Sequence, residues 1–145
     1  MIRRLLSQLL SSLDALRYAA LRGRRRSAHS LGRRGEDLAH RYLQQKGFRV
    51  LARNWTGPHL AEVDIVAQVE GQMVFVEVKS RADAEHGSPE RALDHLKIVS
   101  QRRAARAWAR RAGIEPTGIR FDLITVVFSE PPLIEHFPDA WSFKH

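Results

Sequence analysis

Apolar side chains between residues 33 and 46 recur at three- and four-residue steps, the spacing of one face of an α-helix. The residues on that face are Leu38, Ala39, Tyr42 and Leu43. Ser30 is suited to cap this helix, and Gly47 is suited to end it because glycine readily adopts left-handed backbone. The pattern predicts a first helix with one buried face.

Beyond Gly47 the hydrophobic period shortens toward two, which is typical of β-strands. Strands are predicted over residues 48–55, 60–69 and 73–81, with a fourth over 119–128. Glu70 and Gly71 are predicted to form the two-residue turn of a tight hairpin between the second and third strands. A polar loop and a helix from Pro89 or Glu90 to about residue 111 are predicted before the fourth strand.

This order of elements predicts an α/β fold of mixed α+β type, with a mixed central sheet of four to five strands flanked by helices. The second helix can cross over and return a strand parallel to an earlier one. One domain is expected over residues 31–130, since 145 residues with 43% hydrophobic content suffice for a single core. The proline-containing tail, residues 131–145, is expected to add little regular structure.

Residues 1–30 are expected to form a separate basic segment. Apolar residues recur at helical spacing within residues 1–20, and the arginine-rich residues 22–32 are predicted to be a linker. This helix could anchor the protein to a membrane surface or a partner, but we favour an extension packed loosely on its own domain. Gln8 and Asp14 interrupt any signal-peptide pattern, so we expect a cytoplasmic protein.

The formal net charge is +8, and 20 of the 24 lysines and arginines are arginine. Arginine suits bidentate phosphate contacts, so nucleic acid is the first partner to consider and an anionic membrane surface the second. A GC-rich genome would produce the same enrichment, so charge alone does not decide. The absence of cysteine excludes disulfides and cysteine-based zinc sites.

The hairpin turn also sets a pairing register, in which Asp64 lies opposite Glu77 and Glu62 opposite Lys79. Because side chains alternate across a sheet, these four charged residues share one face. Two carboxylates placed directly opposite each other repel, and a bound divalent cation would relieve that repulsion. The alternative is a lattice of weak salt bridges on a solvated face.

The strands are too hydrophobic to be half exposed, which favours a metal site over a surface lattice. Mg²⁺ or Mn²⁺ would bind Asp64 and Glu77 and keep water molecules for chemistry. Lys79 on the same face could orient or deprotonate such a water, or stabilise charge that develops on a phosphate. Glu36 lies at the edge of the first helix's apolar stripe and is a third acid able to approach.

The second predicted helix has two chemically different sides. Lys97 and Trp108 fall on its buried arc, and Gln101 lies beside them, so Lys97 and Gln101 could reach a scissile phosphate. Lys97 could equally extend from the edge of the core into solvent. The opposite side carries Arg102, Arg106 and Arg110. That row could follow a nucleic-acid backbone or form a plain solvated face.

Several segments together resemble the YraN-like family of small bacterial proteins, which are predicted nucleases distantly similar to archaeal Holliday junction resolvases. The matching segments are GRRGEDLAHRYLQQKGFRVLARN, AEVDIVA, MVFVEVKSR, the ALDHLK helix and RFDLI, in this order over residues 31–128. The resemblance implies a PD-(D/E)xK, restriction-endonuclease-like core with Mg²⁺-dependent hydrolysis of phosphodiester bonds. Ala61 replaces the family's usual glycine, which affects the backbone at the strand entry but not the acids.

The resemblance also implies a role for each charged residue. Asp64 and Glu77 would be the metal ligands and Lys79 the catalytic lysine. Glu36 would be the acid on the preceding helix, and Glu62 the acid two positions before the aspartate. The arginines expected to contact nucleic acid are Arg33, Arg34, Arg81, Arg102, Arg106 and Arg110.

The expected function is therefore that of a structure-selective, metal-dependent DNA endonuclease acting on branched or damaged substrates, without a small-molecule cofactor. The resolvase-like relatives act as dimers, so a homodimer is plausible. One alternative is a non-catalytic nucleic-acid-binding module, although carboxylates beside a phosphate would repel it. Another is a membrane-surface adaptor that uses residues 1–20.

Overall fold

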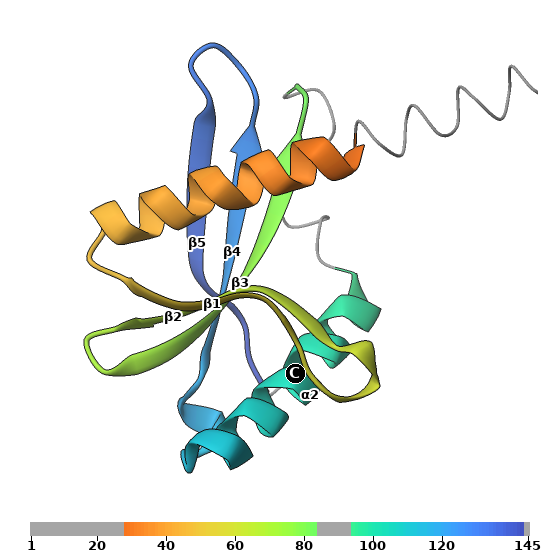
Figure 1. Cartoon of the computed structure of the whole chain (residues 1–145), viewed down its shortest axis with the longest axis vertical. Helices are drawn as coiled ribbons and strands as arrows, with labels where there is room; N and C mark the ends of the chain where they lie inside the picture. The colour runs from red at the N-terminus through yellow and green to blue at the C-terminus, as the bar shows by residue number, and fades with distance from the viewer. Residues whose placement is uncertain (1–27, 84–93, 144–145) are drawn as a thin grey trace, which may run out of the picture.

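The computed structural model describes residues 28–83 and 94–143. They form a five-stranded sheet with a helix on each face (Figure 1). In chain order the elements are a helix over residues 28–45, β1 (Arg49–Thr56), η1 (Pro58–Leu60), β2 (Glu62–Val69), β3 (Gln72–Arg81), α2 (His95–Ala112), η3 (Pro116–Gly118), β4 (Arg120–Val127) and β5 (Leu133–Trp141). The predicted class, a mixed sheet flanked by helices, is confirmed.

The strands lie in the order β1-β2-β3-β4-β5, and all neighbours are antiparallel except β3 and β4, which are parallel. The crossover through α2 makes this parallel pair possible, as predicted. At the β2–β3 turn Val69 pairs with Gln72. Glu70 and Gly71 have φ values of 49° and 79°, the left-handed backbone of a type I′ hairpin. The predicted turn is therefore confirmed.

Each face of the sheet buries its own apolar cluster. On one face, Ala39 and Leu43 of the helix over residues 28–45 pack with Ile65 and Val76. On the other face, α2 packs mainly through alanines against a cluster that includes Phe75. Because alanine side chains are small, α2 lies close to the sheet. This close approach brings the longer polar side chains of α2 next to β3.

The first helix begins earlier than predicted. Residues 28–32 were predicted to be linker, but they are helical, so Ser30 lies inside the helix and is not its cap. Leu31 is partly buried and extends the apolar stripe by one turn. A helix that is already packed gains an extra turn at little cost, because nucleation is the expensive step.

The prediction for the start of α2 was also wrong. The helix α2 begins at His95, and Pro89 and Glu90 lie outside the described residues. Asp94 has extended backbone, and its carboxylate accepts a hydrogen bond from the N–H of Leu96 at 3.1 Å. A capping aspartate satisfies a backbone donor that would otherwise lack a partner, which explains this boundary.

The tail is not irregular, as had been expected, because it forms β5 along the edge of β4. Trp141 is buried and stacks on Phe121 with ring centroids 5.5 Å apart. Pro138 lies within β5, and an edge strand tolerates proline because its outer N–H groups need no partner in the sheet. The proline that argued against a strand is therefore compatible with this position.

Some expectations fall on residues that the structure does not describe. The N-terminal amphipathic helix and most of the basic linker lie within residues 1–27, and most of the predicted loop lies within residues 84–93. Over the described ranges, no helix combines the length and apolar character that crossing a membrane requires.

Candidate active site between β3 and α2

The strands β2 and β3 separate at the open end of their hairpin, opposite the turn. Their paired register ends at Ile65 and Val76. One residue further, Asp64 Oδ2 accepts a hydrogen bond from the backbone N–H of Val78 at 2.8 Å. A carboxylate thus takes the position that a strand carbonyl would occupy in a continued ladder, and the sheet opens at this point.

The predicted cross-strand pairs beyond this point do not form. Asp64 was expected directly opposite Glu77, and Glu62 opposite Lys79, but neither pair belongs to the ladder. The physical reason lies in α2, whose Gln101 side chain connects the two strands. Its Nε2 donates to the Glu62 carbonyl oxygen at 3.3 Å and to Glu77 Oε2 at 3.0 Å.

Glu77 is the most closely contacted acid of this region, with only 2% of its surface exposed. Its Oε1 lies 3.1 Å from Lys79 Nζ, and its Oε2 lies 3.2 Å from Lys97 Nζ. Lys97 and Gln101 are four residues apart on α2, so they face the same direction. The structure therefore brings together Glu77, Lys79, Lys97 and Gln101, which were all candidates from the sequence.

The pKa of Asp64 is raised to about 7 from an ordinary value of 3.8. Burial is the main cause, and the negative charge of Glu77 is the next. The hydrogen bond from Val78 and the charge of Lys97 act in the opposite direction but do not compensate. Without an additional cation, the region is therefore unfavourable for two ionised carboxylates.

The negative charge of Glu77 destabilises the ionised form of Asp64, whereas it stabilises the ionised form of Lys97. Burial by itself would lower its pKa, but the charges of Glu77 and Asp64 outweigh burial and raise it. The ammonium group therefore stays protonated at the wall of the site. The Oε1 atom of the fully buried Gln101 has no hydrogen-bond partner within the described part of the chain. It is an acceptor that a water or substrate group could use.

Glu36 approaches the site from the other helix, and its side chain is 16% exposed. Its Oε2 accepts hydrogen bonds from Arg53 at 3.3 Å and Asn54 at 3.2 Å, and its charge contributes to the raised pKa of Asp64. Gly35 makes this approach possible, because a Cβ there would collide with Ser80 Oγ. The glycine lets the helix lie directly on β3.

Arg53 and Asn54 were not among the candidates from the sequence. Both lie on β1, 17 and 18 residues after Glu36, and they orient its carboxylate. No local pattern reveals such a contact, because it depends on how the helix lies across the sheet. Glu62, which was a candidate, keeps its side chain exposed and contributes its backbone carbonyl instead.

The side chains that could hold a metal are Asp64 and Glu77. Two carboxylates suit Mg²⁺ or Mn²⁺, which commonly bind one or two such groups and retain water molecules. In residues 28–83 and 94–143 there is no group of three acidic or histidine side chains arranged to hold an ion. A donor set of two carboxylates fits a hydrated hard cation.

The candidate arginines lie in different surroundings. Arg33 and Arg34 are exposed on the first helix, and the Arg34 guanidinium lies 4.8 Å from the Phe128 ring centre. Arg81 is partly buried at the end of β3. On α2, Arg102 Nε donates to the Ser142 carbonyl oxygen at 2.7 Å. The row predicted on α2 is thus partly engaged with the C-terminal residues.

Comparison with known proteins identifies the family. A sequence model described as "Uncharacterised protein family UPF0102" matches residues 35–126. The chain belongs to this family. A UPF0102 protein of Solibacter usitatus is 43% identical over 119 residues, which cover 81% of this chain and 90% of the relative. A UPF0102 protein of Geobacter sulfurreducens is 40% identical and covers 79% of this chain, and one of Rhodococcus jostii is 39% identical and covers 77%.

The alignment with these UPF0102 proteins covers 91% of the Geobacter protein and 96% of the Rhodococcus protein, so the family resemblance extends over nearly the whole relative. The stretch matched by the UPF0102 family model, residues 35–126, contains both carboxylates and both lysines of the candidate site. The name UPF0102 assigns no activity. Activity must therefore be argued from the chemistry of the site.

Proposed function

We propose that this UPF0102 protein hydrolyses phosphodiester bonds of nucleic acid with the help of Mg²⁺ or Mn²⁺, as a structure-selective DNA endonuclease. One observation carries the proposal. The carboxylates of the partly buried Asp64 and the buried Glu77 lie where β2 and β3 separate, and two lysines contact Glu77. A carboxyl group such as Asp64, whose pKa is raised by burial and by a neighbouring acid, is common where a site binds a cation or a proton.

The chemistry assigns different tasks to the residues. Asp64 and Glu77 would hold the ion, which supplies an activated water and neutralises charge on the phosphate. Lys79 is 36% exposed at its side chain and would orient the attacking water. Lys97 remains protonated and would hold a non-bridging phosphate oxygen. Gln101 keeps the Glu77 carboxylate in place.

A non-catalytic nucleic-acid-binding module is the second candidate, and one observation favours it. Both oxygens of Glu77 already have cationic partners, so this acid is neutralised without a metal ion. In that case the lysines would serve the fold and phosphate binding would occur elsewhere. A membrane-surface adaptor acting through residues 1–20 would lose its localisation if residues 1–27 were deleted, whereas a nuclease would keep cleaving in vitro.

The deciding experiment measures cleavage of labelled duplex, single-stranded, forked and four-way DNA by the full chain with Mg²⁺ or Mn²⁺. Asp64→Asn and Lys79→Ala should each reduce the rate about 100-fold or more. Glu115→Gln and Lys46→Ala are matched controls, because they make similar charge changes at exposed positions. Cleavage that survives in both site variants, or no cleavage by the parent on any substrate, would reject the proposal.

A further inference from the structure

A cleft of about 360 Å³ lies between the β1–β2 turn and the C-terminal half of α2. Trp55, Thr56, Gly57 and Pro58 form its wall on the turn side. The helix side is formed by Ala107, Arg110 and Arg111. One opening therefore combines aromatic and aliphatic surface with two guanidinium groups.

Four of the five arginines of α2 fall into two groups. Arg102 donates to the Ser142 carbonyl oxygen at 2.7 Å, and the Arg106 guanidinium lies 5.2 Å from the Phe143 ring centre. These two arginines face the C-terminal residues. Arg110 and Arg111 are exposed and face the cleft, in the last turn of the helix. Arg103 is also exposed but does not line the cleft, so Arg110 and Arg111 are the α2 arginines that a ligand in the cleft would meet.

The turn beside the cleft has a strained backbone. His59 and Leu60 are consecutive non-glycine residues with φ of 56°, a left-handed conformation that side chains disfavour. The turn is nevertheless closed, because the Gly57 N–H donates to the Ala61 carbonyl oxygen at 2.7 Å. Leu60 at its tip is 84% exposed. A held, strained turn that presents an apolar side chain to solvent suggests a contact surface.

The helix α2 contributes residues both to the cleft and to the candidate active site. Gly57 lies against α2, since a Cβ there would be 3.6 Å from Ala104 Cα. After the turn the chain enters β2 at Glu62, whose carbonyl oxygen accepts a hydrogen bond from Gln101. Arg110 follows Gln101 by nine residues, about 13.5 Å along the helix axis.

We propose that this cleft binds an unpaired strand of nucleic acid that leads to the site at Glu77, an inference that rests on the proposed function. Arg110 and Arg111 hold its phosphates, while Pro58 and the exposed Leu60 contact an unstacked base. Single strands are bound in this way, through basic grooves with apolar or aromatic surfaces for the bases. A closed duplex offers phosphates but no free base, so it would leave Leu60 without a contact.

The test measures binding of the full chain to labelled forked DNA and to blunt duplex of equal length by fluorescence anisotropy, in EDTA. Binding in EDTA does not depend on catalysis, so it separates this inference from the proposed nuclease activity. Arg110→Ala/Arg111→Ala should weaken binding to the fork about tenfold and reduce the slope of log affinity against log salt by about 2. Leu60→Ala should lower the preference for fork over duplex about fivefold.

The matched control is Arg41→Ala/Arg103→Ala, which removes the same charge from two exposed positions outside the cleft. It should change binding less than threefold. The ratio of the affinity for the fork to the affinity for the duplex is compared, because phosphate binding by other arginines, including those in residues 1–27, contributes to both affinities. Equal losses in the control and cleft variants, or equal losses for fork and duplex, would overturn the inference. If the cleft variants lose binding to the fork selectively and the parent cleaves no substrate, the result would support strand binding in the cleft and reject the proposed nuclease activity.

Discussion

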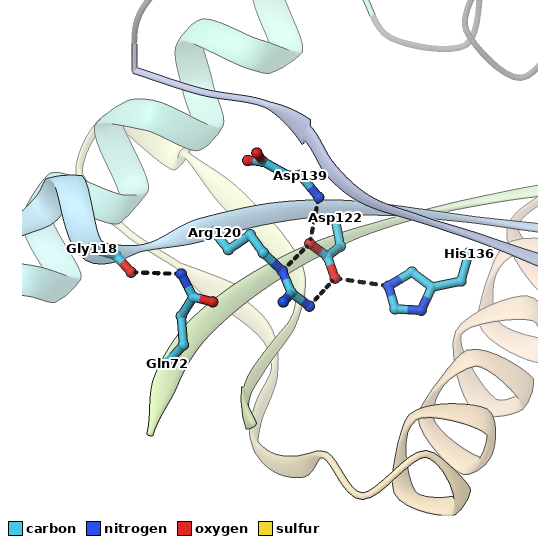
Figure 2. Close-up of polar contacts among 6 residues, drawn as sticks. All are labelled: Gln72, Gly118, Arg120, Asp122, His136 and Asp139. Atoms are coloured by element: carbon cyan, nitrogen blue, oxygen red, sulfur yellow. Dashed lines mark hydrogen bonds and ion pairs between the residues drawn. The ribbon is translucent and has the colours of Figure 1, made fainter. Parts of the chain in front are cut away.

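The buried carboxylate of Asp122 and the partly buried carboxylate of Asp64 have opposite electrostatic surroundings. At one end of β4, Asp122 is 0% exposed and is surrounded by donors, as Figure 2 shows. Arg120 binds it through two hydrogen bonds of 2.8 Å, His136 Nε2 lies 2.7 Å away, and the Asp139 N–H donates at 3.1 Å. At the candidate site, Asp64 has one backbone donor and a second acid beside it.

The pKa values express this difference. Burial by itself raises the pKa of Asp122, but hydrogen bonds from His136, Arg120 and Asp139 outweigh burial and lower it. Asp64 lacks such compensation, and its pKa rises to about 7. A fully satisfied buried acid connects β4 to β5 and stabilises the fold. An incompletely satisfied one indicates a position kept for binding or chemistry.

The strongest test of this comparison replaces each acid in turn. Asp122→Ala should lower the free energy of unfolding by about 3 to 5 kcal/mol, because it leaves Arg120 and His136 without their buried partner. Asp64→Asn should leave stability unchanged or raise it when no metal is bound. Urea unfolding at pH 7.5 in EDTA measures both. A larger loss for Asp64→Asn than for Asp122→Ala would reverse the roles assigned to the two acids.

The second prediction concerns pH. Unfolded Asp64 ionises near 3.8 and folded Asp64 near 7, so the folded state holds more protons between these values. Stability in EDTA should therefore fall as pH rises through this window. The fall should be on the order of 1 to 3 kcal/mol, at about 1.36 kcal/mol per pKa unit discounted for coupling to Glu77.

The contribution of Asp122 to the pH dependence of stability has the opposite sign, because the pKa of Asp122 is lowered in the folded state. Its stabilisation is present above 3.8 and is lost as pH falls through its folded pKa, so it does not contribute to the change between 4 and 7. Asp64→Asn should therefore flatten the pH profile in that range. An unchanged profile in this variant would show that another group carries the dependence.

The third prediction tests how the first helix reaches the site. Gly35→Ala should destabilise the protein relative to Gly32→Ala by about 2 kcal/mol, because the new Cβ collides with Ser80 while residue 32 has no atom within 4 Å. Both changes favour the helix equally, so thermal unfolding isolates the packing cost. Combining Gly35→Ala with Ser80→Gly should restore much of the loss. No restoration would mean that the helix does not lie against β3 at this point.

The smallest expected effect on stability is that of Glu36→Gln. Its contacts with Arg53 and Asn54 are partly solvated, so unfolding free energy should change by less than about 1 kcal/mol. Under the proposed function, the cleavage rate should nevertheless fall about tenfold, since the charge near Asp64 changes. A change in stability without a change in cleavage would assign Glu36 to the fold alone.

Much of the fold was predictable because its signals are local. Signals from neighbouring residues predict the turn at Glu70 and Gly71 and the helix stop at Gly47. They also predict the order of elements that gives the crossover before β4. The strand β5 was missed because the prolines of the tail were taken as a sign of irregular structure, and its edge position became evident only from its pairing with β4. The early start of the first helix was missed because Ser30 resembles a cap.

The candidate site shows the same division. The sequence identified Asp64, Glu77 and Lys79 as one charged cluster, and it proposed Lys97 and Gln101 as their neighbours. It did not reveal that β2 and β3 separate before these residues. The contact between Arg53 and Glu36 was equally hidden, because it joins residues that only packing brings together.

The sequence by itself determined the order and type of the central elements, the hairpin turn and which charged residues could act together. These features follow from hydrophobic periodicity and turn chemistry, which operate over a few residues. Only the tertiary structure decided that Asp122 is satisfied while Asp64 is not. Burial and hydrogen-bond partners come from segments distant in sequence, so the charge state of an acid depends on how those segments pack.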